Sequence, residues 1–127
     1  MSHDKWMIYG ANGYTGKIAA EQAAAKGRRP LLAGRSEAKI KPIADALMLD
    51  YVVFDLANAE ATEKALSDVD LVLHCAGPFS ATSKPMVDAC LKTKTHYLDI
   101  TGEIGVFEDI HGRDAQAKQA GVALIPG

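Results

Sequence analysis

Three glycines near the N-terminus, each three residues after the last, restrict the fold more than any other feature of this sequence. Gly10, Gly13 and Gly16 follow an apolar run that ends at Tyr9, and an alanine-rich segment with helical spacing comes after them. A buried strand that reverses into a helix within a few residues needs glycine, which reaches unusual backbone angles and leaves room for a phosphate group. The helix start then offers free N–H groups and the positive end of its dipole. The stretch therefore predicts a strand, a phosphate-binding turn and a helix.

The spacing of these glycines is G-x-x-G-x-x-G, whereas the commoner dinucleotide-binding pattern is G-x-G-x-x-G. Extended and atypical dinucleotide-binding reductases use this variant, so the turn is a candidate dinucleotide site. The glycines alone do not choose between nucleotides.

Length and charge narrow the class of protein. With 127 residues the chain fits one domain, and its 48% of hydrophobic residues is ordinary for a soluble globular protein. No apolar run approaches the length of a membrane span, and no signal peptide precedes the first strand, so we expect a cytoplasmic protein. The net charge of −2, with both signs interspersed, disfavours nucleic acid as a partner.

The cysteines and histidines indicate no metal site. Cys75 and Cys90 form no C-x-x-C pair and lie in apolar segments, so we expect free, buried thiols. The four histidines lack the spacing of metal ligands.

Apolar runs of strand length alternate with segments of helical periodicity along the whole chain. We expect strands at 5–9, 30–33, 51–54, 71–76, 96–100 and 122–125, with a helix after each of the first five. Gly27 should end the first helix, Asn58 cap the third and Pro85 begin the fourth. The fifth is expected from about 103 to 120, with Gly112 as a weak point and Gly121 as its end. This pattern predicts a single α/β domain over 1–127, a three-layer, doubly wound parallel sheet (Rossmann fold) with strand order 3-2-1-4-5-6.

Ligands of such sheets bind at the carboxyl ends of the strands, near the switch point between the first and fourth strands. A protein that prefers NAD places Asp or Glu after the second strand, but Arg35 and Ser36 stand there in this chain. Arg35 can donate paired hydrogen bonds to a 2′-phosphate and Ser36 can add a hydroxyl, which predicts NADP as the cofactor. The alternative is a solvated Arg35 and a Ser36 that only caps the next helix. Lys39 is a weaker candidate for the same phosphate.

The ends of the third and fourth strands supply further candidates. Asp55 could meet the adenine amine, although an exposed aspartate at a strand end explains it equally well. Ala76, Gly77 and Pro78 are small or turn-forming residues that let the backbone pass close beneath a cofactor, and a tight turn would use the same residues.

Catalytic residues are not identifiable in the sequence. Thr101 and Glu103 suit the start of a helix, as a cap and a first-turn charge, and a catalytic role for Glu103 is the alternative. No tyrosine is followed by lysine at the fourth position, which excludes the acid–base pair of short-chain reductases. No nucleophile elbow, Walker lysine or zinc pattern replaces it.

Four motifs in the same order resemble the saccharopine dehydrogenase-like oxidoreductases, including the trans-acting enoyl reductase branch. They are YGANGYTG at Tyr9–Gly16, LAGRS at Leu32–Ser36, CAGPF at Cys75–Phe79 and HYLDITGE at His96–Glu103. The likeness covers essentially the whole chain. The resemblance implies a two-domain architecture, in which a Rossmann domain precedes a mixed domain that supplies the substrate pocket and often the dimer contact.

The resemblance implies an NADP-binding Rossmann domain and hydride transfer between NADPH and a C=N, C=O or activated C=C bond. It implies that the cofactor is bound by Gly10, Gly13, Tyr14, Thr15 and Arg35, with Ala76, Gly77 and Pro78 along its middle. Asn12, Gly16, Ser36 and Asp55 complete the candidate set. The chain stops at Gly127, where members of the family pass into the second domain. We therefore expect the catalytic and substrate domain to be absent and this chain alone to be inactive.

Two other hypotheses stay open at this point. The chain could be a non-catalytic NADP-binding or redox-sensing module that acts through a partner protein, or a structural interaction domain with a degenerate site. The resemblance also implies a small-molecule substrate in the missing domain and a homodimer as one assembly of the full-length protein.

Overall fold

The computed structural model describes residues 3–100 and 104–126 of the chain. Strands and helices alternate along it, as the apolar periodicity predicts. The elements are β1 (Trp6–Tyr9), α1 (Tyr14–Ala25), β2 (Leu31–Gly34), α2 (Glu37–Leu47), β3 (Tyr51–Val53), α3 (Ala59–Leu66), β4 (Leu71–His74), α4 (Phe79–Thr93), β5 (His96–Asp99), α5 (Ile104–His111), α6 (Asp114–Ala120) and β6 (Leu124–Ile125).

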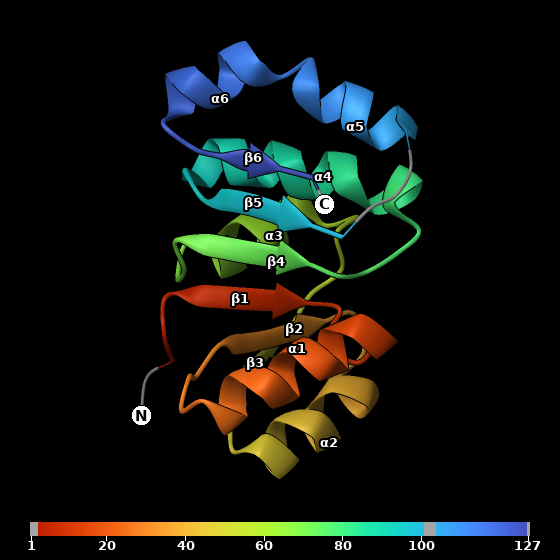
Figure 1. The fold of residues 1–127 in the computed structure, drawn as a ribbon, viewed down its shortest axis with the longest axis vertical. Coiled ribbons are helices and arrows are strands. Elements are labelled where there is room, and N and C mark those ends of the chain that lie inside the picture. The colour runs from red at the N-terminus through yellow and green to blue at the C-terminus, as the bar shows by residue number, and fades with distance from the viewer. Residues whose placement is uncertain (1–2, 101–103, 127) are drawn as a thin grey trace.

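All six strands lie in one parallel sheet, in the order β3-β2-β1-β4-β5-β6 (Figure 1). The first two crossovers carry the chain outward from β1 to β3. The next, through α3, returns it to the other side of β1, where β4 pairs with it. The predicted strand order and fold class are confirmed, and the switch point lies between β1 and β4.

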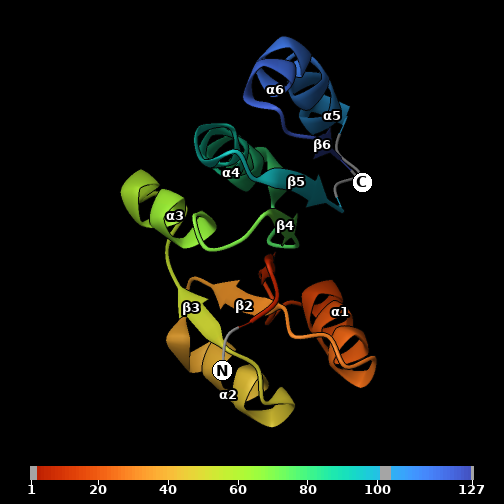
Figure 2. The same cartoon turned by 90° about the vertical axis from the view of Figure 1, so that its left-hand side faces the viewer.

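Helices lie on both faces of the sheet (Figure 2). On one face Ile8 of β1 clusters with Ala20 of α1 and Ala44 of α2, and these small side chains let both helices pack close to the sheet. On the other face Met7 belongs to a larger cluster that includes Val87 of α4 and residues of α3 and α5. Successive residues of a strand point to opposite faces, so β1, β2, β3 and β4 contribute to both clusters.

The fourth helix begins earlier than the sequence predicts. It starts at Phe79, so Pro85 lies inside α4 and does not begin it. Phe79 is 8% exposed and its ring meets that of His74 edge-on at 5.1 Å, which anchors the first turn in the core. Pro85 has no N–H, so the carbonyl of Ala81 loses its intrahelical donor. Ala81 is exposed, so water can replace that donor at little cost.

The helical segment before β6 is divided into α5 and α6 near Gly112, the weak point in the sequence. Glycine is among the poorest helix formers, which favours a break there. Arg113 follows as the N-cap of α6, and its guanidinium forms a hydrogen-bonded ion pair with Asp88 of α4. This pair ties the start of α6 to α4.

Two predicted helix ends are confirmed in detail. Gly27 follows α1 with φ +77°, and the N–H groups of Gly27 and Arg28 bond to the carbonyls of Ala24 and Ala23 in a Schellman arrangement. At the start of α3 the side chain of Asn58 accepts a hydrogen bond from the N–H of Ala61 at 3.0 Å.

Both cysteines are free, with Cys90 buried and Cys75 half-buried. The residues that the structure describes include no group of three or more His, Cys, Asp or Glu that could hold a metal ion. Among the same residues, no helix has both the length and the apolar character needed to span a membrane.

Candidate nucleotide-binding site

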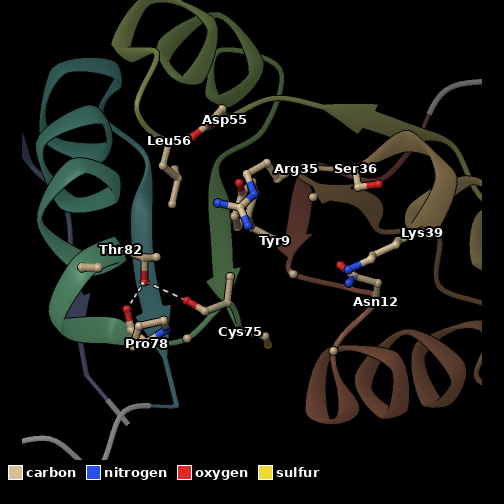
Figure 3. A pocket seen from close by; sticks show the side chains of 16 residues that line it. Tyr9, Asn12, Arg35, Ser36, Lys39, Asp55, Leu56, Cys75, Pro78 and Thr82 are labelled. Carbon is tan, nitrogen blue, oxygen red and sulfur yellow. Dashed lines mark hydrogen bonds between the residues drawn. The ribbon is translucent and has the colours of Figure 1, made fainter.

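A cavity of about 400 Å³ lies at the carboxyl ends of β1, β2 and β4, beside the switch point of the sheet (Figure 3). Nine of the twelve predicted cofactor-binding residues line it. They are Gly10, Asn12, Gly13, Arg35, Ser36, Asp55, Ala76, Gly77 and Pro78. The other three, Tyr14, Thr15 and Gly16, are not part of its lining.

The three glycines of the first turn serve different purposes. Gly10 has φ +84°, and a Cβ there would lie 2.8 Å from the backbone nitrogen of Ala76, so the turn can touch the end of β4 only with glycine. A Cβ on Gly16 would lie 2.2 Å from the carbonyl oxygen of Gly10, so this glycine brings α1 against the turn. A Cβ on Gly13 would meet only that same oxygen, at 3.4 Å. Packing therefore explains Gly10 and Gly16, whereas Gly13 keeps space open beside the cavity.

The N-terminus of α1 lies at the edge of this cavity. Gly13 is its N-cap, no side chain caps it, and its first turn has no acidic residue. The first N–H groups of a helix have no intrahelical acceptor and carry the positive end of the dipole. The side chain of Tyr14 is 85% exposed, Thr15 is exposed as well, and neither residue lines the cavity.

Two cations lie at the end of β2. Arg35 and Lys39 are both exposed, and within the described part of the chain neither is held in an ion pair. Figure 3 shows the Arg35 side chain directed into the cavity and Lys39 reaching toward Asn12. Ser36 is the N-cap of α2, but its side chain does not cap that helix, which is against the purely structural interpretation.

Asp55 has a structural role at the end of β3. Its carboxylate accepts a hydrogen bond from the N–H of Ala57 at 2.9 Å and so closes the turn before α3. Asp55 is the one acidic residue among the described residues that line the cavity. The exposed strand-end aspartate that the sequence left as an alternative is therefore sufficient to explain this residue.

The loop after β4 is held from beneath by Thr82 of α4. Its hydroxyl lies 2.7 Å from the carbonyl oxygen of Ala76 and 3.2 Å from that of Pro78, and the bond joining Gly77 to Pro78 is cis. A Cβ on Gly77 would have no neighbour closer than 4.0 Å, so packing does not require glycine there. Gly13 and Gly77 thus leave open space on two sides of the same cavity.

His74 supports Thr82 from the core. The two side chains are joined at 2.9 Å through Nε2, and His74 is fully buried. Burial lowers the pKa of His74 to about 4, which keeps the ring neutral at neutral pH. Because the Thr82 hydroxyl donates to a carbonyl, Nε2 must carry the ring proton and donate to Thr82. Nδ1 then remains as a buried acceptor with no partner among the described residues.

The tyrosine and cysteine side chains of the cavity hold their protons at neutral pH. Burial raises the pKa of Tyr9 to about 12, and the Tyr9 hydroxyl donates to the carbonyl of Phe54 at 3.0 Å. Burial raises the pKa of Cys75 to about 11, so its thiol is not an activated nucleophile. The predicted cap and carboxylate, Thr101 and Glu103, lie outside the described residues. The cavity as described is equipped to bind a ligand, and it shows no acid–base pair.

Six residues of the lining were not among the predicted ones, namely Tyr9, Gly34, Leu56, Cys75, Ala81 and Thr82, and Lys39 was predicted only as a weaker candidate. Ala81 and Thr82 were missed because the helix start was placed at Pro85. Tyr9 could have been found, because it is the last residue of the strand that enters the glycine turn.

Comparison with known proteins agrees with this geometry. Residues 6–125 match the family model described as the saccharopine dehydrogenase NADP binding domain. A trans-acting enoyl reductase of Mycobacterium leprae is 31% identical over 95% of this chain and 31% of its own length. A saccharopine dehydrogenase-like oxidoreductase of Mus musculus is 27% identical over 94% of this chain and 32% of its own length. The chain thus spans about a third of the length of these relatives.

A solved structure shares the fold. Apo saccharopine dehydrogenase (L-Glu forming) from Saccharomyces cerevisiae superimposes with a TM-score of 0.79 at 19% identity, over 95% of this chain and 26% of that one.

Proposed function

The chain belongs to the saccharopine dehydrogenase NADP binding domain family, and from that premise we propose that its cavity binds NADP in preference to NAD. Membership of the family makes a nicotinamide dinucleotide the ligand. The preference rests on one observation: Arg35 and Lys39 line the cavity after β2, whereas the acidic residue of the described lining, Asp55, follows β3. A carboxylate after β2 would bind the ribose 2′-hydroxyl of NAD and repel the 2′-phosphate of NADP.

The residues of the cavity fit the phosphate groups of such a cofactor. Gly13 and the free N–H groups of α1 would hold the pyrophosphate, and Arg35 and Ser36 would hold the 2′-phosphate. The open space at Gly77 accommodates the middle of the cofactor. When bound, the cofactor supplies hydride transfer, and the C=N, C=O and activated C=C bonds are the substrate classes that we consider.

The complete reaction needs residues beyond those of the cavity. We place the substrate pocket and the catalytic residues in the part of a longer protein that corresponds to the other two thirds of the relatives. We place the full-length protein in the cytoplasm, with a homodimer as its assembly. A non-catalytic redox-sensing module has less support, because the matched relatives are named as reductases and oxidoreductases.

Calorimetric titration with NADPH and NADH tests the preference. Charge-assisted hydrogen bonds contribute about 1.5–3 kcal/mol, so we expect NADPH to bind about 10- to 100-fold more tightly than NADH. Arg35→Ala should remove most of that preference and leave the affinity for NADH nearly unchanged. Because Arg35 is exposed, its replacement should not change the free energy of unfolding.

Arg28→Ala is the matched control, because Arg28 is also an exposed arginine but follows the C-terminal end of α1, away from the cavity. It should bind both nucleotides like the wild type. Equal affinity of the wild type for NADPH and NADH, or a preference that survives in Arg35→Ala, would contradict the proposal.

A further inference from the structure

Half of one sheet face has no helix on it within residues 3–100 and 104–126. On the face that α1 and α2 cover, these helices pack on β1, β2 and β3. Right-handed crossovers place the later helices of the described chain on the opposite face. Figure 1 looks directly at β4, β5 and β6 with no helix in front of them, and Figure 2 shows the same open side in a view along the strands. We call this the open face and define it by Leu71, Leu73, Leu98 and Ile125.

A single row of aliphatic side chains crosses the sheet from the covered half to the open face. Strand register pairs Leu32 with Ile8, Ile8 with Leu73, Leu73 with Leu98, and Leu98 with Ile125. Leu32 and Ile8, beneath the helices, are 0% exposed, whereas Leu73 and Leu98 are half-buried and Ile125 is 52% exposed. The side chains are aliphatic along the whole row, and what changes is whether helices cover them.

Exposure of such an aliphatic row to water is unfavourable. Parallel sheets are buried on both faces, and a solvated sheet face carries polar residues in alternation with apolar ones. Leu71, Leu73, Leu98 and Ile125 stand at positions where those polar residues would be expected, and His96, which pairs with Leu71, is the polar exception among the described residues of this face. The open face is therefore built to be covered by another apolar surface.

We propose that the open face is covered by the polypeptide that follows residue 127 in the full-length protein. The relatives are about three times as long as this chain, so they contain enough further polypeptide for such a cover. Ile125 belongs both to β6, the last described element, and to the row, so β6 itself borders the open face. A segment that leaves β6 reaches this face without crossing the sheet, and the short connection keeps its effective concentration high.

The polypeptide that covers the open face would also lie beside the nucleotide site. Cys75 directly follows β4, packs with the cluster on the same face as Leu73, and lines the cavity. A domain seated on the open face would therefore stand next to the end of β4 and close the cavity from that side. The proposal needs no bound nucleotide, so it can hold or fail independently of the proposed function.

Photo-crosslinking identifies the occupant. The protein is expressed from its whole natural reading frame with p-benzoylphenylalanine in place of Ile125, and in a second variant in place of Leu71. The control position is Met48, which is 79% exposed and follows α2. Equal amounts of ¹⁵N-labelled and unlabelled protein distinguish crosslinks within one chain from crosslinks between copies. NADPH titration of the same variants checks the nucleotide site separately.

The expected result is a crosslink from position 125 or 71 to residues beyond 127 of the same chain, and none from position 48. A crosslink to a second copy, a crosslink to a different protein, or no crosslink from either position would overturn the proposal. A reading frame that stops at Gly127 would also overturn it. Crosslinks of the expected kind in a protein that does not bind NADPH would leave this inference standing and refute the proposed function.

Discussion

Replacement of Gly10 by alanine tests whether the contact between the first turn and the end of β4 determines the fold here. Two penalties act at this position. Gly10 has φ +84°, which L side chains rarely adopt, and the new Cβ would lie 2.8 Å from the nitrogen and 2.9 Å from the Cβ of Ala76. Gly27 has nearly the same φ, +77°, but a Cβ there would meet nothing within 4 Å. Comparison of Gly10→Ala with Gly27→Ala therefore separates the cost of backbone strain from the cost of steric overlap.

The expected magnitudes follow from these distances. A left-handed conformation costs a non-glycine residue about 1–2 kcal/mol, so Gly27→Ala should lower the free energy of unfolding by that amount. Overpacking adds about 1–3 kcal/mol, because the atoms opposite Gly10 are backbone and cannot move aside like a flexible side chain. Gly10→Ala should therefore cost about 2–5 kcal/mol, a large share of the stability of a typical domain.

Urea denaturation followed by circular dichroism measures both variants against the wild type, with thermal unfolding as a second readout. At this chain length each kcal/mol corresponds to about 3–5 °C in Tm, so the two variants should be clearly resolved. Equal losses in Gly10→Ala and Gly27→Ala would refute the reasoning. They would mean that the loop at Ala76 moves away at no cost and that the close contact does not hold the turn.

Three further substitutions separate binding, pH dependence and capping. Gly13→Ala should change the free energy of unfolding by less than about 1 kcal/mol, because its Cβ has only a 3.4 Å contact, yet calorimetry should show weaker NADPH binding because the space beside the cavity is filled. His74 has a pKa of about 4 when folded and an ordinary value of 6.5 when unfolded, so its contribution to stability is complete above pH 6.5 and declines as the pH falls toward 4. Between pH 7.5 and pH 5 the wild type should lose about 2 kcal/mol more than His74→Gln in urea titrations, and equal losses would contradict this assignment. Asn58→Ala removes the side-chain acceptor for the N–H of Ala61 and should cost about 0.5–2 kcal/mol by the same measurement, whereas an unchanged midpoint would show that water replaces the cap.

The order of the strands could be predicted because local patterns and chirality restrict it together. Each apolar run marks a strand, each periodic segment marks a crossover, and right-handed crossovers leave few arrangements. The start of α4 could not be predicted, because Pro85 is a strong local signal for a first helical turn. The decisive interaction is a tertiary one, the burial of Phe79 against His74, which the local sequence does not reveal.

The location of the cavity could likewise be predicted, because every strand of a parallel sheet ends at the same edge. The interactions that support the cavity from beneath could not be predicted from the sequence. Thr82 and His74 hold the loop after β4 from α4 and from the core, and their hydrogen bond joins residues that carry no recognisable motif. Sequence patterns identify the residues that could touch a ligand, whereas the interactions that position those residues depend on packing.

The glycine pattern itself shows how far a motif can indicate function. Gly10 and Gly16 are required by contacts within the protein, since a Cβ at either position would overlap with backbone atoms. A chain that kept this fold but lost its nucleotide would still need both of them. Gly13 and Gly77 are under no such requirement, and the space at these two positions beside the cavity is available to a ligand. The outer glycines of the motif therefore indicate the fold, and the evidence for binding lies in Gly13, in Gly77 and in the cations at the end of β2.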